Sequence, residues 1–478
     1  MKRHTAIFWF RRDLRLADNP ALHHALSHFN VIPVYLHCPD EQVPWMPGAA
    51  SRWWLHHSLN RLNESLGRLG SKLVIRQGEN AKILLNELIE ESGSRAVFWN
   101  RLYTPTARQR DQEIKSYLRD HGIEAESFNA SLIHDPWVIL KKDKTPYRVF
   151  TAWWVKMVET GLKCDLLPAP KSMSSSVSSL KTLAIESLGL LSDHRWHAKF
   201  DEQWQTGEQA AQQQVKHMFR QVIDKYATQR DRPDVSGTSR LSPYLHFGEI
   251  SPRQVLNELL NSIDAPVTAK GKSSAERFAA ELGWRDFSAY LLYHFPDTVD
   301  RPLNRQFENF AWAKQYKDEL MAWQEGRTGI PIVDAGMREL WATGWMHNRV
   351  RMIVASFLTK NLLIPWQEGA NWFWDCLVDA DLASNTMGWQ WVAGCGADAA
   401  PYFRIFNPVL QGEKFDPQGL YIKKWIPEMA AVPDKYLHQP WAYKVAQPEQ
   451  AVSKYPAPIV DLKESRERAL QAYRKLSS

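Results

Sequence analysis

The sequence predicts a chain in two parts: an α/β N-terminal domain with a doubly wound parallel sheet, then an all-α C-terminal domain. Three observations indicate this fold. Short apolar runs alternate with amphipathic stretches up to about residue 130, a Ser-, Pro- and Lys-rich stretch follows at 168–182, and nearly every periodic stretch after about residue 206 has helical spacing. A chain of 478 residues is also too long for one ordinary core.

The strands come first. Four apolar runs predict them: AIFWF (6–10), VIPVYL (31–36), KLVI (72–75) and AVFW (96–99). The amphipathic stretches 53–70 and 107–122 lie between and after these runs and predict covering helices. The strand ends of such a sheet can hold a nucleotide-like ligand at a switch point. No GxGxxG or GxxxxGK[ST] motif follows a strand, so a Rossmann dinucleotide site and a P-loop are disfavoured.

The domain boundaries follow from where these patterns change. We place the α/β domain at 1–130, an interdomain linker at 131–205 and the all-helical domain at 206–478. Helical spacing is clearest at 208–227 and 276–295. No internal repeat interrupts this order.

Composition restricts the class of protein. Charged residues make up 23% and hydrophobic residues 44% of the chain, no run of eighteen apolar residues predicts a membrane span, and the apolar run near the N-terminus is too short for a secretory signal. The four cysteines are scattered, without a CxxC pair, which disfavours a disulfide framework and a zinc site: Cys38, Cys164, Cys376 and Cys395. We therefore expect a cytoplasmic protein without a metal.

Two further counts bear on partners. The net charge of +6 favours a polyanionic partner without proving one. The chain also carries 22 tryptophans, which most simply build large cores; stacking on bases or a cofactor, or electron transfer, is the sharper alternative.

The helix at 276–295 places Glu281, Trp284 and Arg285 on one face. Taken alone, Glu281 and Arg285 are more simply explained as a surface ion pair four residues apart, worth a few tenths of a kcal/mol. A carboxylate beside an indole on a mostly apolar helix otherwise needs a partner or a function.

A second helix, at 344–360, carries an amide between two apolar groups, in the stripe Trp345, Asn348 and Met352. A pocket wall explains Asn348, and a solvated helix end explains it almost as well. His347 is more simply structural, since no second His or Cys lies at metal spacing.

Two other stretches carry polar groups where a plain core would not. The turn GTSRLSPYL (237–245) offers hydroxyls at the start of a helix, which suits either a phosphate or an ordinary N-cap. The stretch DADLASNTMGWQWVAG (379–394) puts two carboxylates and an amide next to two indoles.

Taken together, these motifs resemble the DNA photolyase/cryptochrome family. The resemblance runs from about residue 4 to 470 and rests on five stretches: RRDLRLADNPAL (11–22), GTSRLSPYL (237–245), ELGWRDF (281–287), TGIPIVDAGMRELWATGWMHNRVRM (328–352) and DADLASNTMGWQW (379–391). It implies an N-terminal antenna domain and a C-terminal helical domain that binds FAD.

The resemblance also assigns flavin contacts. They fall on Tyr226, Thr238, Ser239, Arg240, Leu241, Ser242, Arg285, Trp345, Arg351, Asp379, Asp381 and Asn385. Arg351 is expected to pair with Asp379, because a buried carboxylate needs a compensating charge. Asn385 is expected to face flavin N5 as a hydrogen-bond acceptor. Plant cryptochromes typically carry Asp there and animal ones Cys, so Asn385 argues for a photolyase.

The same resemblance implies an activity: light-dependent repair of cyclobutane pyrimidine dimers by a deoxyribodipyrimidine photo-lyase. The lesion-contacting residues are expected to be Glu281, Trp284, Asn348, Met352 and Trp391. Glu281 is expected to act in its protonated form. Relatives that repair (6-4) photoproducts carry a pair of active-site histidines, and the segment HNRVRM (347–352) lacks the HxxxH stretch. The dimer is expected to flip out of the duplex, as in the photolyases that illustrate base flipping.

Electron transfer and DNA binding are assigned in the same way. Trp389 matches the flavin-proximal member of the family's tryptophan chain, Trp366 the middle one and Trp312 the distal one, although the spacing after Trp312 differs by one residue from the family pattern. The expected phosphate contacts are Arg349, Arg404, Gln411 and Lys414. We expect UV-damaged DNA as partner and a monomer that is not bound to membranes.

The antenna chromophore is expected to be methenyltetrahydrofolate, with a deazaflavin as the other possibility. A glutamate of the commonest folate-binding type is absent from NRLYTPTARQRD (100–111), whereas SRWWLHHSL (51–59) resembles plant cryptochromes and the bacterial photolyases most similar to them. No residues are assigned to it.

Two rival interpretations remain at this stage. A blue-light-sensing cryptochrome with little or no repair activity is disfavoured by Asn385, by Met352 and by the end of the chain soon after the helical domain. An α/β dehydrogenase with a helical cap would need a glycine-rich loop after the first strand, and RRDLRLADN (11–19) is not one.

Overall fold

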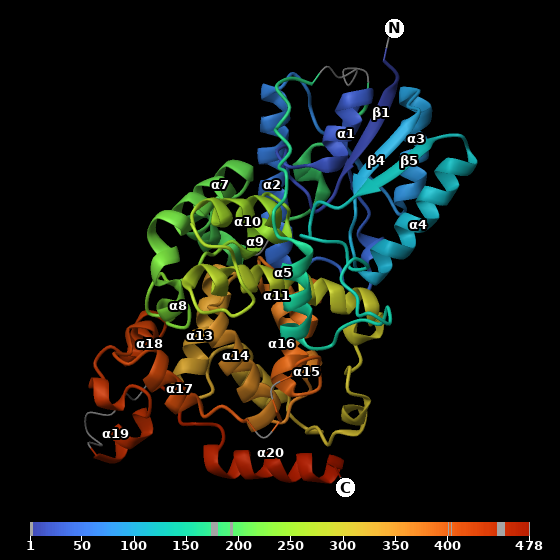
Figure 1. Cartoon of the computed structure of the whole chain (residues 1–478). Coiled ribbons are helices and arrows are strands. Elements are labelled where there is room, and N and C mark those ends of the chain that lie inside the picture. Colours follow the sequence, from blue (N-terminus) through green and yellow to red (C-terminus); the bar gives the residue numbers. More distant parts are fainter. Residues whose placement is uncertain are drawn as a thin grey trace.

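The protein is described here by a computed structural model, which covers residues 3–173, 180–191, 195–399, 401–402, 404–446 and 455–477. Residues 174–179, within the Ser-rich stretch 168–182, therefore lie outside the described residues. Figure 1 shows an α/β part at the N-terminal end and a larger helical part beneath it.

The α/β part contains one parallel sheet of order β3-β2-β1-β4-β5. Its strands are β1 (Thr5–Phe10), β2 (Asn30–His37), β3 (Val74–Gln77), β4 (Ala96–Asn100) and β5 (Glu124–Phe128). The helices of this part are α1 (Pro20–His28), α2 (Ala49–Arg68), α3 (Ala81–Ser92) and α4 (Pro105–Asp120). Strands β2 and β3 are added on one side of β1, and β4 and β5 on the other side. This reversal of strand order at β1 and β4 confirms the predicted doubly wound arrangement.

Both faces of the sheet are buried. Phe8 and Phe10 point into a core shared with α1, α2 and the helical part, whereas Ile7 and Trp9 point into a second core built with α3 and α4. This alternation explains the continuous apolar runs that predicted β1, β2 and β4. The fifth strand, β5, was not predicted, because only Ala125 among its residues is buried and its edge position tolerates polar side chains.

The segment 131–205 is more structured than a linker composition suggests. It contains α5 (Phe150–Thr160), whose Phe150, Trp153 and Trp154 are buried in the shared core, and the short α6 (Phe200–Gln203). Apolar aromatic side chains of α5 therefore join the two parts by packing rather than by tethering alone.

The helical part follows. Its first helices are α7 (Glu208–His217), α8 (Tyr226–Gln229), α9 (Ser242–His246), α10 (Pro252–Asn261), α11 (Ser274–His294) and α12 (Lys317–Gln324). The central helices are α13 (Pro331–Thr343), α14 (Asn348–Ser356), α15 (Trp366–Cys376) and α16 (Leu382–Ala393). The last are α17 (Pro408–Phe415), α18 (Leu420–Trp425), α19 (Pro440–Ala446) and α20 (Leu462–Ser477).

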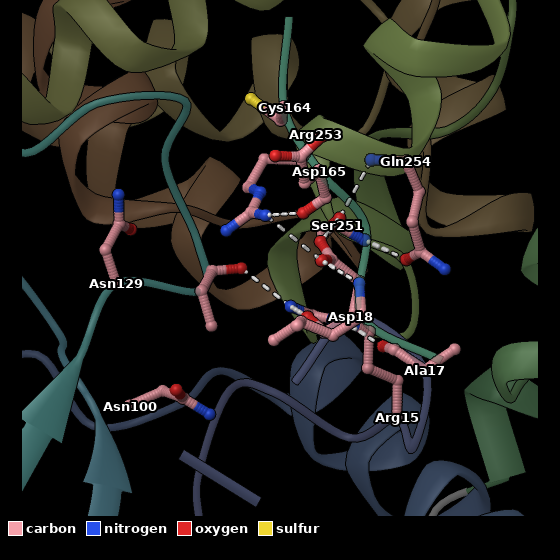
Figure 2. Close-up of polar contacts among 12 residues, drawn as sticks. Arg15, Ala17, Asp18, Asn100, Asn129, Cys164, Asp165, Ser251, Arg253 and Gln254 are labelled. Carbon is pink, nitrogen blue, oxygen red and sulfur yellow. Dashed lines mark hydrogen bonds and ion pairs between the residues drawn. The ribbon is translucent and has the colours of Figure 1, made fainter. Parts of the chain in front are cut away.

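A polar seam, formed by the motif at 11–22 and the loops around it, locks the two parts together (Figure 2). The guanidinium of Arg15, 1% exposed, donates to the carbonyls of Ala17, Asp18, Ala130 and Gly248 at 2.7–3.1 Å. Because these carbonyls come from both parts of the chain, the seam fixes how the α/β part sits on the helices.

Asp18 completes this seam from the other side. Its carboxylate accepts a 2.6 Å hydrogen bond from the Ser251 hydroxyl and lies 3.4 Å from the guanidinium of Arg253. Arg253 also donates to the Asp165 carbonyl. Figure 2 shows these contacts converging at the start of α10. Buried charges that are paired and hydrogen-bonded in this way hold one relative placement of the parts.

Candidate functional site

The turn at 237–242, before α9, packs tightly against α8. A Cβ at Gly237 would lie 2.5 Å from the Gln229 carbonyl oxygen, so a side chain does not fit there. Gln214 donates a 2.7 Å hydrogen bond to the Ser239 carbonyl and so holds the turn from α7. Leu241 occupies the N-cap of α9 without a side-chain capping bond. The Ser239 hydroxyl accepts a 3.4 Å hydrogen bond from the Leu241 amide, whereas an N-cap role does not account for the hydroxyls of Thr238 and Ser242.

Arg240 presents a half-buried cation next to this turn. It adopts a left-handed backbone (φ 49°), and its guanidinium lies over the rings of Trp204 (4.3 Å) and Trp345 (5.0 Å). Burial lowers its pKa, although Glu339 works in the opposite direction. Its Nε is buried and has no hydrogen-bond partner among the described residues. A cation in this state lacks an anion, and a diphosphate would supply one.

Arg351 and Asp379 form the predicted ion pair. One guanidinium nitrogen of Arg351 lies 2.9 and 3.1 Å from the two oxygens of Asp379, whose side chain is almost fully buried. The Nε of Arg351 donates to the Met346 carbonyl at 2.7 Å, which fixes the side chain along α14. Trp345, also buried, lies beneath both Arg240 and Arg351. Four of the expected flavin contacts thus meet in one place.

Asp381 begins α16 as its N-cap, accepting a 2.9 Å hydrogen bond from the Ser384 amide. Burial would raise the pKa of Asp381, but His246, Arg285 and the Ser384 amide together lower it, so the carboxyl stays charged. His246 lies 3.7 Å away, and burial lowers the pKa of its imidazole. Asp381 therefore keeps a negative charge beside the imidazole of His246.

Asn385 lies one turn further along α16. Its Nδ2 donates a 3.0 Å hydrogen bond to the Ala370 carbonyl on α15. A carbonyl oxygen only accepts, so the amide nitrogen must face Ala370 and the Oδ1 is left as an acceptor. This orientation is the one expected of a residue that accepts a hydrogen bond from a protonated ring nitrogen.

Arg285 does not pair with Glu281, so the surface ion pair that their spacing suggested is wrong. Arg285 donates instead to the carbonyls of Ser131 (2.5 Å) and Leu245 (3.3 Å) and lies 3.4 Å from Asp286. Backbone carbonyls far away in the chain offer it fixed acceptors, which a solvated carboxylate on the same helix does not.

Glu281 pairs with a residue that the sequence analysis did not single out. The guanidinium of Arg230 lies 2.5 Å from its carboxylate and 5.4 Å from the centre of the buried ring of Tyr226. Arg230 thus occupies the carboxyl group of Glu281 in the free protein, and a ligand that hydrogen-bonds Glu281 has to displace this guanidinium.

Trp284 also has an unpredicted partner. Its ring stacks on Phe150 of α5 with 3.6 Å between ring centres and 10° between planes. One face of the indole is therefore covered by the chain itself, and the side chain remains half-buried. A rigidly held aromatic surface in the middle of α11 suits stacking on a planar ligand.

The remaining predicted lesion contacts lie on α14 and α16. Asn348 is exposed at the first position of α14, whereas Met352 and Trp391 are half-buried. Helix α14 begins four residues later than predicted, because the Nδ1 of His347 accepts a 3.2 Å hydrogen bond from the Arg349 amide and caps the helix. His347 is thus structural, as its sequence context suggested. Burial lowers its pKa to about 4.

Two of the three predicted electron-transfer tryptophans are deeply buried. Trp389 and Trp366 are 3% and 2% exposed, and Trp312 is half-buried against Phe310. Helices α15 and α16 approach so closely that a Cβ at Gly369 would lie 2.0 Å from the Trp389 ring. Trp323, which was not predicted, has its ring centre 6.2 Å from that of Trp389.

The four predicted DNA contacts share one groove. Arg349, Arg404, Gln411 and Lys414 all line a cavity of about 1370 Å³ between α14, α17 and α20. The Nε of Arg349 is buried and lacks a partner within the described ranges. A groove lined by cations suits a phosphate backbone, and a phosphate at Arg349 would replace Asp231, which lies 2.9 Å from its guanidinium.

Comparison with known proteins gives a consistent result. The family described as "FAD binding domain of DNA photolyase" matches residues 278–475, and that described as "DNA photolyase" matches residues 6–171. The deoxyribodipyrimidine photo-lyase of Agrobacterium fabrum is 43% identical over 483 residues, covering 99% of this chain and 98% of the relative. Cryptochrome-2 of Arabidopsis thaliana is 38% identical, covering 96% of this chain and 77% of the relative.

A solved structure agrees with these relatives. A bacterial class III photolyase from Agrobacterium tumefaciens superimposes with a TM-score of 0.92 at 42% identity, covering 100% of this chain and 98% of that one. Fold and site together define a protein with an α/β part and a helical, FAD-binding part. The chain belongs to the DNA photolyase/cryptochrome family, and its C-terminal part is an FAD-binding domain of the photolyase type. In the part of the chain that the structure describes, no helix is long and apolar enough to cross a lipid bilayer.

Proposed function

We propose that this protein is a deoxyribodipyrimidine photo-lyase that repairs cyclobutane pyrimidine dimers in DNA with the energy of blue light. Residues 1–130 would form its antenna domain, 131–205 the connection and 206–478 the catalytic domain. Similarity to the photo-lyase of Agrobacterium fabrum over nearly the whole of both chains supports this assignment.

The residues around Arg240 fit FAD. Arg240 with the turn at 237–242 would hold the diphosphate, and the Arg351–Asp379 pair with Asn385 would hold the isoalloxazine ring. When bound in its reduced form, FAD supplies the electron that splits the dimer after it absorbs light. The Oδ1 of Asn385 would hold a proton at the ring nitrogen N5, because Ala370 fixes the amide in that orientation.

The observation that carries the choice of lesion is the state of His347. Repair through a histidine acid requires an imidazole that is protonated near neutral pH. His347 is 3% exposed, its Nδ1 accepts from the helix and its pKa lies at about 4, so it is neutral. Asn348 and Met352, its neighbours on α14, carry no proton to transfer. The pocket therefore suits a dimer whose ring opens by electron transfer alone.

The other chain groups position the dimer. Trp284, backed by Phe150, offers one stacking surface and Trp391 a second. Glu281 and Asn348 would hydrogen-bond the pyrimidine edges once DNA draws Arg230 away from Glu281. Arg349, Arg404, Gln411 and Lys414 would contact phosphates, which makes binding independent of sequence and sensitive to salt.

Repair assays test this proposal. Reduced protein under blue light should restore oligo(dT) that contains cyclobutane dimers and should leave a (6-4) photoproduct intact. Glu281→Ala should lower the quantum yield of repair more than Glu281→Gln, which keeps a hydrogen-bonding group. Intact cyclobutane dimers after illumination of the reduced protein would refute the assignment.

The alternative is a blue-light-sensing cryptochrome, which the similarity to Arabidopsis cryptochrome-2 keeps open. Asn385 favours the photo-lyase, because its neutral amide cannot donate a proton as an Asp can. The same dimer assay separates the two: a cryptochrome would be photoreduced and leave the dimer unrepaired.

Photoreduction is proposed to pass along Trp389, Trp366 and Trp312 to the surface. The burial of Trp389 and Trp366 and the partial exposure of Trp312 support an inside-to-outside order. In the variant Trp389→Phe, light should no longer reduce the flavin. The same variant, when its flavin is reduced chemically, should still repair the dimer. Wild-type photoreduction in Trp389→Phe would exclude this route.

A second cofactor is proposed as an antenna, methenyltetrahydrofolate or else a deazaflavin. A cavity of about 350 Å³ lies at the carboxyl ends of β1 and β2, where the sequence predicted a ligand at the strand switch point. Trp9, Tyr35 and Arg110 line it. Arg110 already contacts Glu41 and Asp111, so the lining of the cavity fits either chromophore. An absorption spectrum of the purified protein would identify which of the two is bound.

A further inference from the structure

Side chains of alternating charge connect Glu281 in the candidate lesion pocket with Arg349 in the groove of the predicted DNA contacts. Glu281 on α11 contacts Arg230, which follows α8, and Arg230 lies beside its chain neighbour Asp231. Asp231 in turn contacts Arg349 near the start of α14. The two ends of this series are proposed to meet different parts of the DNA, a pyrimidine and a phosphate. Neither proposed contact explains the presence of Asp231.

One carboxylate oxygen of Asp231 is shared by the two arginines. The Oδ1 lies 2.9 Å from a terminal nitrogen of Arg349 and 3.9 Å from the Nε of Arg230. The shorter distance is that of a hydrogen-bonded ion pair, and the longer one exceeds a hydrogen bond. In the free protein Asp231 therefore pairs mainly with Arg349, while the guanidinium of Arg230 pairs with Glu281 at 2.5 Å.

The four side chains are partly buried, which suits an exchange of partners. The side chains of Arg230 and Arg349 are about one-fifth exposed, and those of Glu281 and Asp231 about one-third. Partial burial makes an ion pair stronger than at a fully exposed surface. The remaining exposure lets solvent stabilise a group while it changes from one partner to another.

A phosphate at Arg349 competes directly with Asp231. It offers the guanidinium two oxygens in a bidentate contact, whereas Asp231 offers only its Oδ1. The displaced carboxylate carries the same sign of charge as the phosphate and is repelled by it. Arg230 is the cation already next to Asp231, so the carboxylate gains most by moving onto Arg230.

We propose that Asp231 and Arg230 form a switch that couples phosphate binding at Arg349 to the opening of the lesion pocket at Glu281. In the closed state Asp231 pairs with Arg349, and Arg230 covers Glu281. In the open state a phosphate occupies Arg349, and Asp231 draws Arg230 away from Glu281. Both switch residues are positioning residues, because they act through Arg349 and Glu281. The inference rests on the proposed repair of DNA.

Such a switch makes two binding events depend on each other. A carboxylate that pairs with one arginine or the other has two states, and both the phosphate and the pyrimidine favour the same state. By linkage, a pyrimidine at Glu281 strengthens the phosphate contact at Arg349 by the same factor, typically about 5 to 150. Both contacts are made together only where a dimer has flipped into the pocket, so the switch raises the preference for damaged DNA.

Dark binding of damaged and undamaged DNA measures this coupling apart from repair. Fluorescence anisotropy would give the affinities for one duplex with and without a cyclobutane dimer, and their ratio is the preference for damage. In Asp231→Asn, Arg349 loses the competitor of the phosphate, so undamaged DNA should bind up to about fivefold more tightly, the value of one exposed ion pair. Arg230 then keeps only Glu281, so the preference should fall about tenfold.

Two further variants separate the switch from the effect of charge alone. Asp231→Glu keeps the carboxylate and should keep most of the preference for damaged DNA. Glu413→Gln removes an exposed carboxylate from α17, between the groove residues Gln411 and Lys414. This control should tighten the binding of both DNAs by the same factor, because one negative charge fewer favours any phosphate backbone, and the preference should not change.

A double variant isolates the step through Arg230. In Arg230→Gln no cation remains for Asp231 to draw away from Glu281. Adding Asp231→Asn to Arg230→Gln should therefore leave the preference of the single variant unchanged, although the same substitution lowers the preference in the wild type.

Two results would overturn the inference. The first is an equal change of both affinities in Asp231→Asn, which would make Asp231 an ordinary surface charge. The second is an equal fall of the preference when Asp231→Asn is added to Arg230→Gln, which would give Asp231 an effect independent of Arg230. If the wild type preferred damaged DNA as described but left the dimer unrepaired under light, the proposed activity would fail and the switch would stand.

Discussion

The seam between the two parts and the ligand-binding region of the helical part use arginines in opposite ways. Arg15 in the seam is buried and donates to four backbone carbonyls from both parts of the chain. Arg240 is half-buried between two indoles, and its buried Nε has no partner in the described part of the protein. Burial lowers the pKa of both guanidinium groups.

The difference separates polar groups that bond to other parts of the chain from polar groups that are left open for a ligand. A buried polar group without a partner costs about 1–3 kcal/mol, so a folded protein retains one only where something else satisfies it. Glu249 belongs to the seam side: its fully buried carboxylate accepts from Trp54, Ser58 and Gly207. Arg349 belongs to the ligand side, because its Nε is buried without a partner among the described residues. Four variants test this division.

The largest effect is expected from Arg15→Met. The substitution removes the donors of four buried carbonyls, so the free energy of unfolding should fall by about 3–5 kcal/mol, measured by chemical denaturation. The control is Arg61→Met, whose guanidinium is 60% exposed and contacts Glu64, and which should cost less than about 1 kcal/mol. Equal losses in the two variants would mean that the seam contributes no more than a surface ion pair.

His347 gives the next largest effect, and it depends on pH. Its pKa is about 4 in the folded protein against an ordinary 6.5, so the unfolded chain binds the extra proton first. The stability that His347 contributes is complete above pH 6.5 and is lost as pH falls towards 4, by about 3 kcal/mol in all. His347→Asn keeps a good N-cap without titrating.

Comparing the two proteins isolates this contribution. The seam carboxyl of Glu249, whose pKa burial raises to about 7, acts in the other direction: it favours the folded state at low pH and loses that effect as pH rises through 7. The difference in unfolding free energy between wild type and His347→Asn should therefore be flat above pH 6.5 and move in favour of the variant below it. A difference independent of pH would show that His347 has the same pKa in the folded protein as in the unfolded chain.

Arg240→Met should separate ligand binding from folding. The unfolding free energy of the flavin-free protein should hardly change, because Met fills the space between Trp204 and Trp345 and no described acceptor loses the Nε donor. FAD affinity should fall about tenfold to a hundredfold, the value of a charged hydrogen bond of about 1.5–3 kcal/mol. Titration of the flavin-free protein with FAD, followed by fluorescence, measures it. A large loss of stability without loss of FAD affinity would place Arg240 on the seam side.

The sequence predicted features that depend on local spacing, and it did not predict contacts between distant segments. Periodicity located β1, β2 and β4 because both faces of the sheet are buried, and it missed β5, where only Ala125 is buried. It also placed Glu281 and Arg285 on one face of α11, which is correct, and suggested their pairing, which is wrong. Spacing shows which side chains are neighbours on a helix and says nothing of acceptors elsewhere in the chain.

Within the site, the resemblance supplied what periodicity could not. Family motifs led to the pair of Arg351 and Asp379, which the structure contains. Arg230 and Phe150 were missed, because each acts through a contact with a distant segment: Arg230 with Glu281 and Phe150 with Trp284. A single sequence without covariation carries no local sign of such contacts.

Phe150→Leu should give the smallest effect, and it asks whether the segment between the two domains takes part in substrate binding. Phe150 lies in α5 and stacks on Trp284 with 3.6 Å between ring centres. Leucine keeps an apolar contact but no stacked ring, a loss of about 0.5–1.5 kcal/mol that corresponds to a twofold to tenfold weaker affinity. Dark binding of dimer-containing DNA should weaken by this factor, while undamaged DNA should bind as before, because only a flipped dimer reaches Trp284. Phe29→Leu, which loosens a comparable ring contact with Phe98 in the α/β part, should change neither affinity. If Phe150→Leu weakened the binding of damaged and undamaged DNA equally, Phe150 would contribute to the stability of the helical part and not to recognition of the dimer.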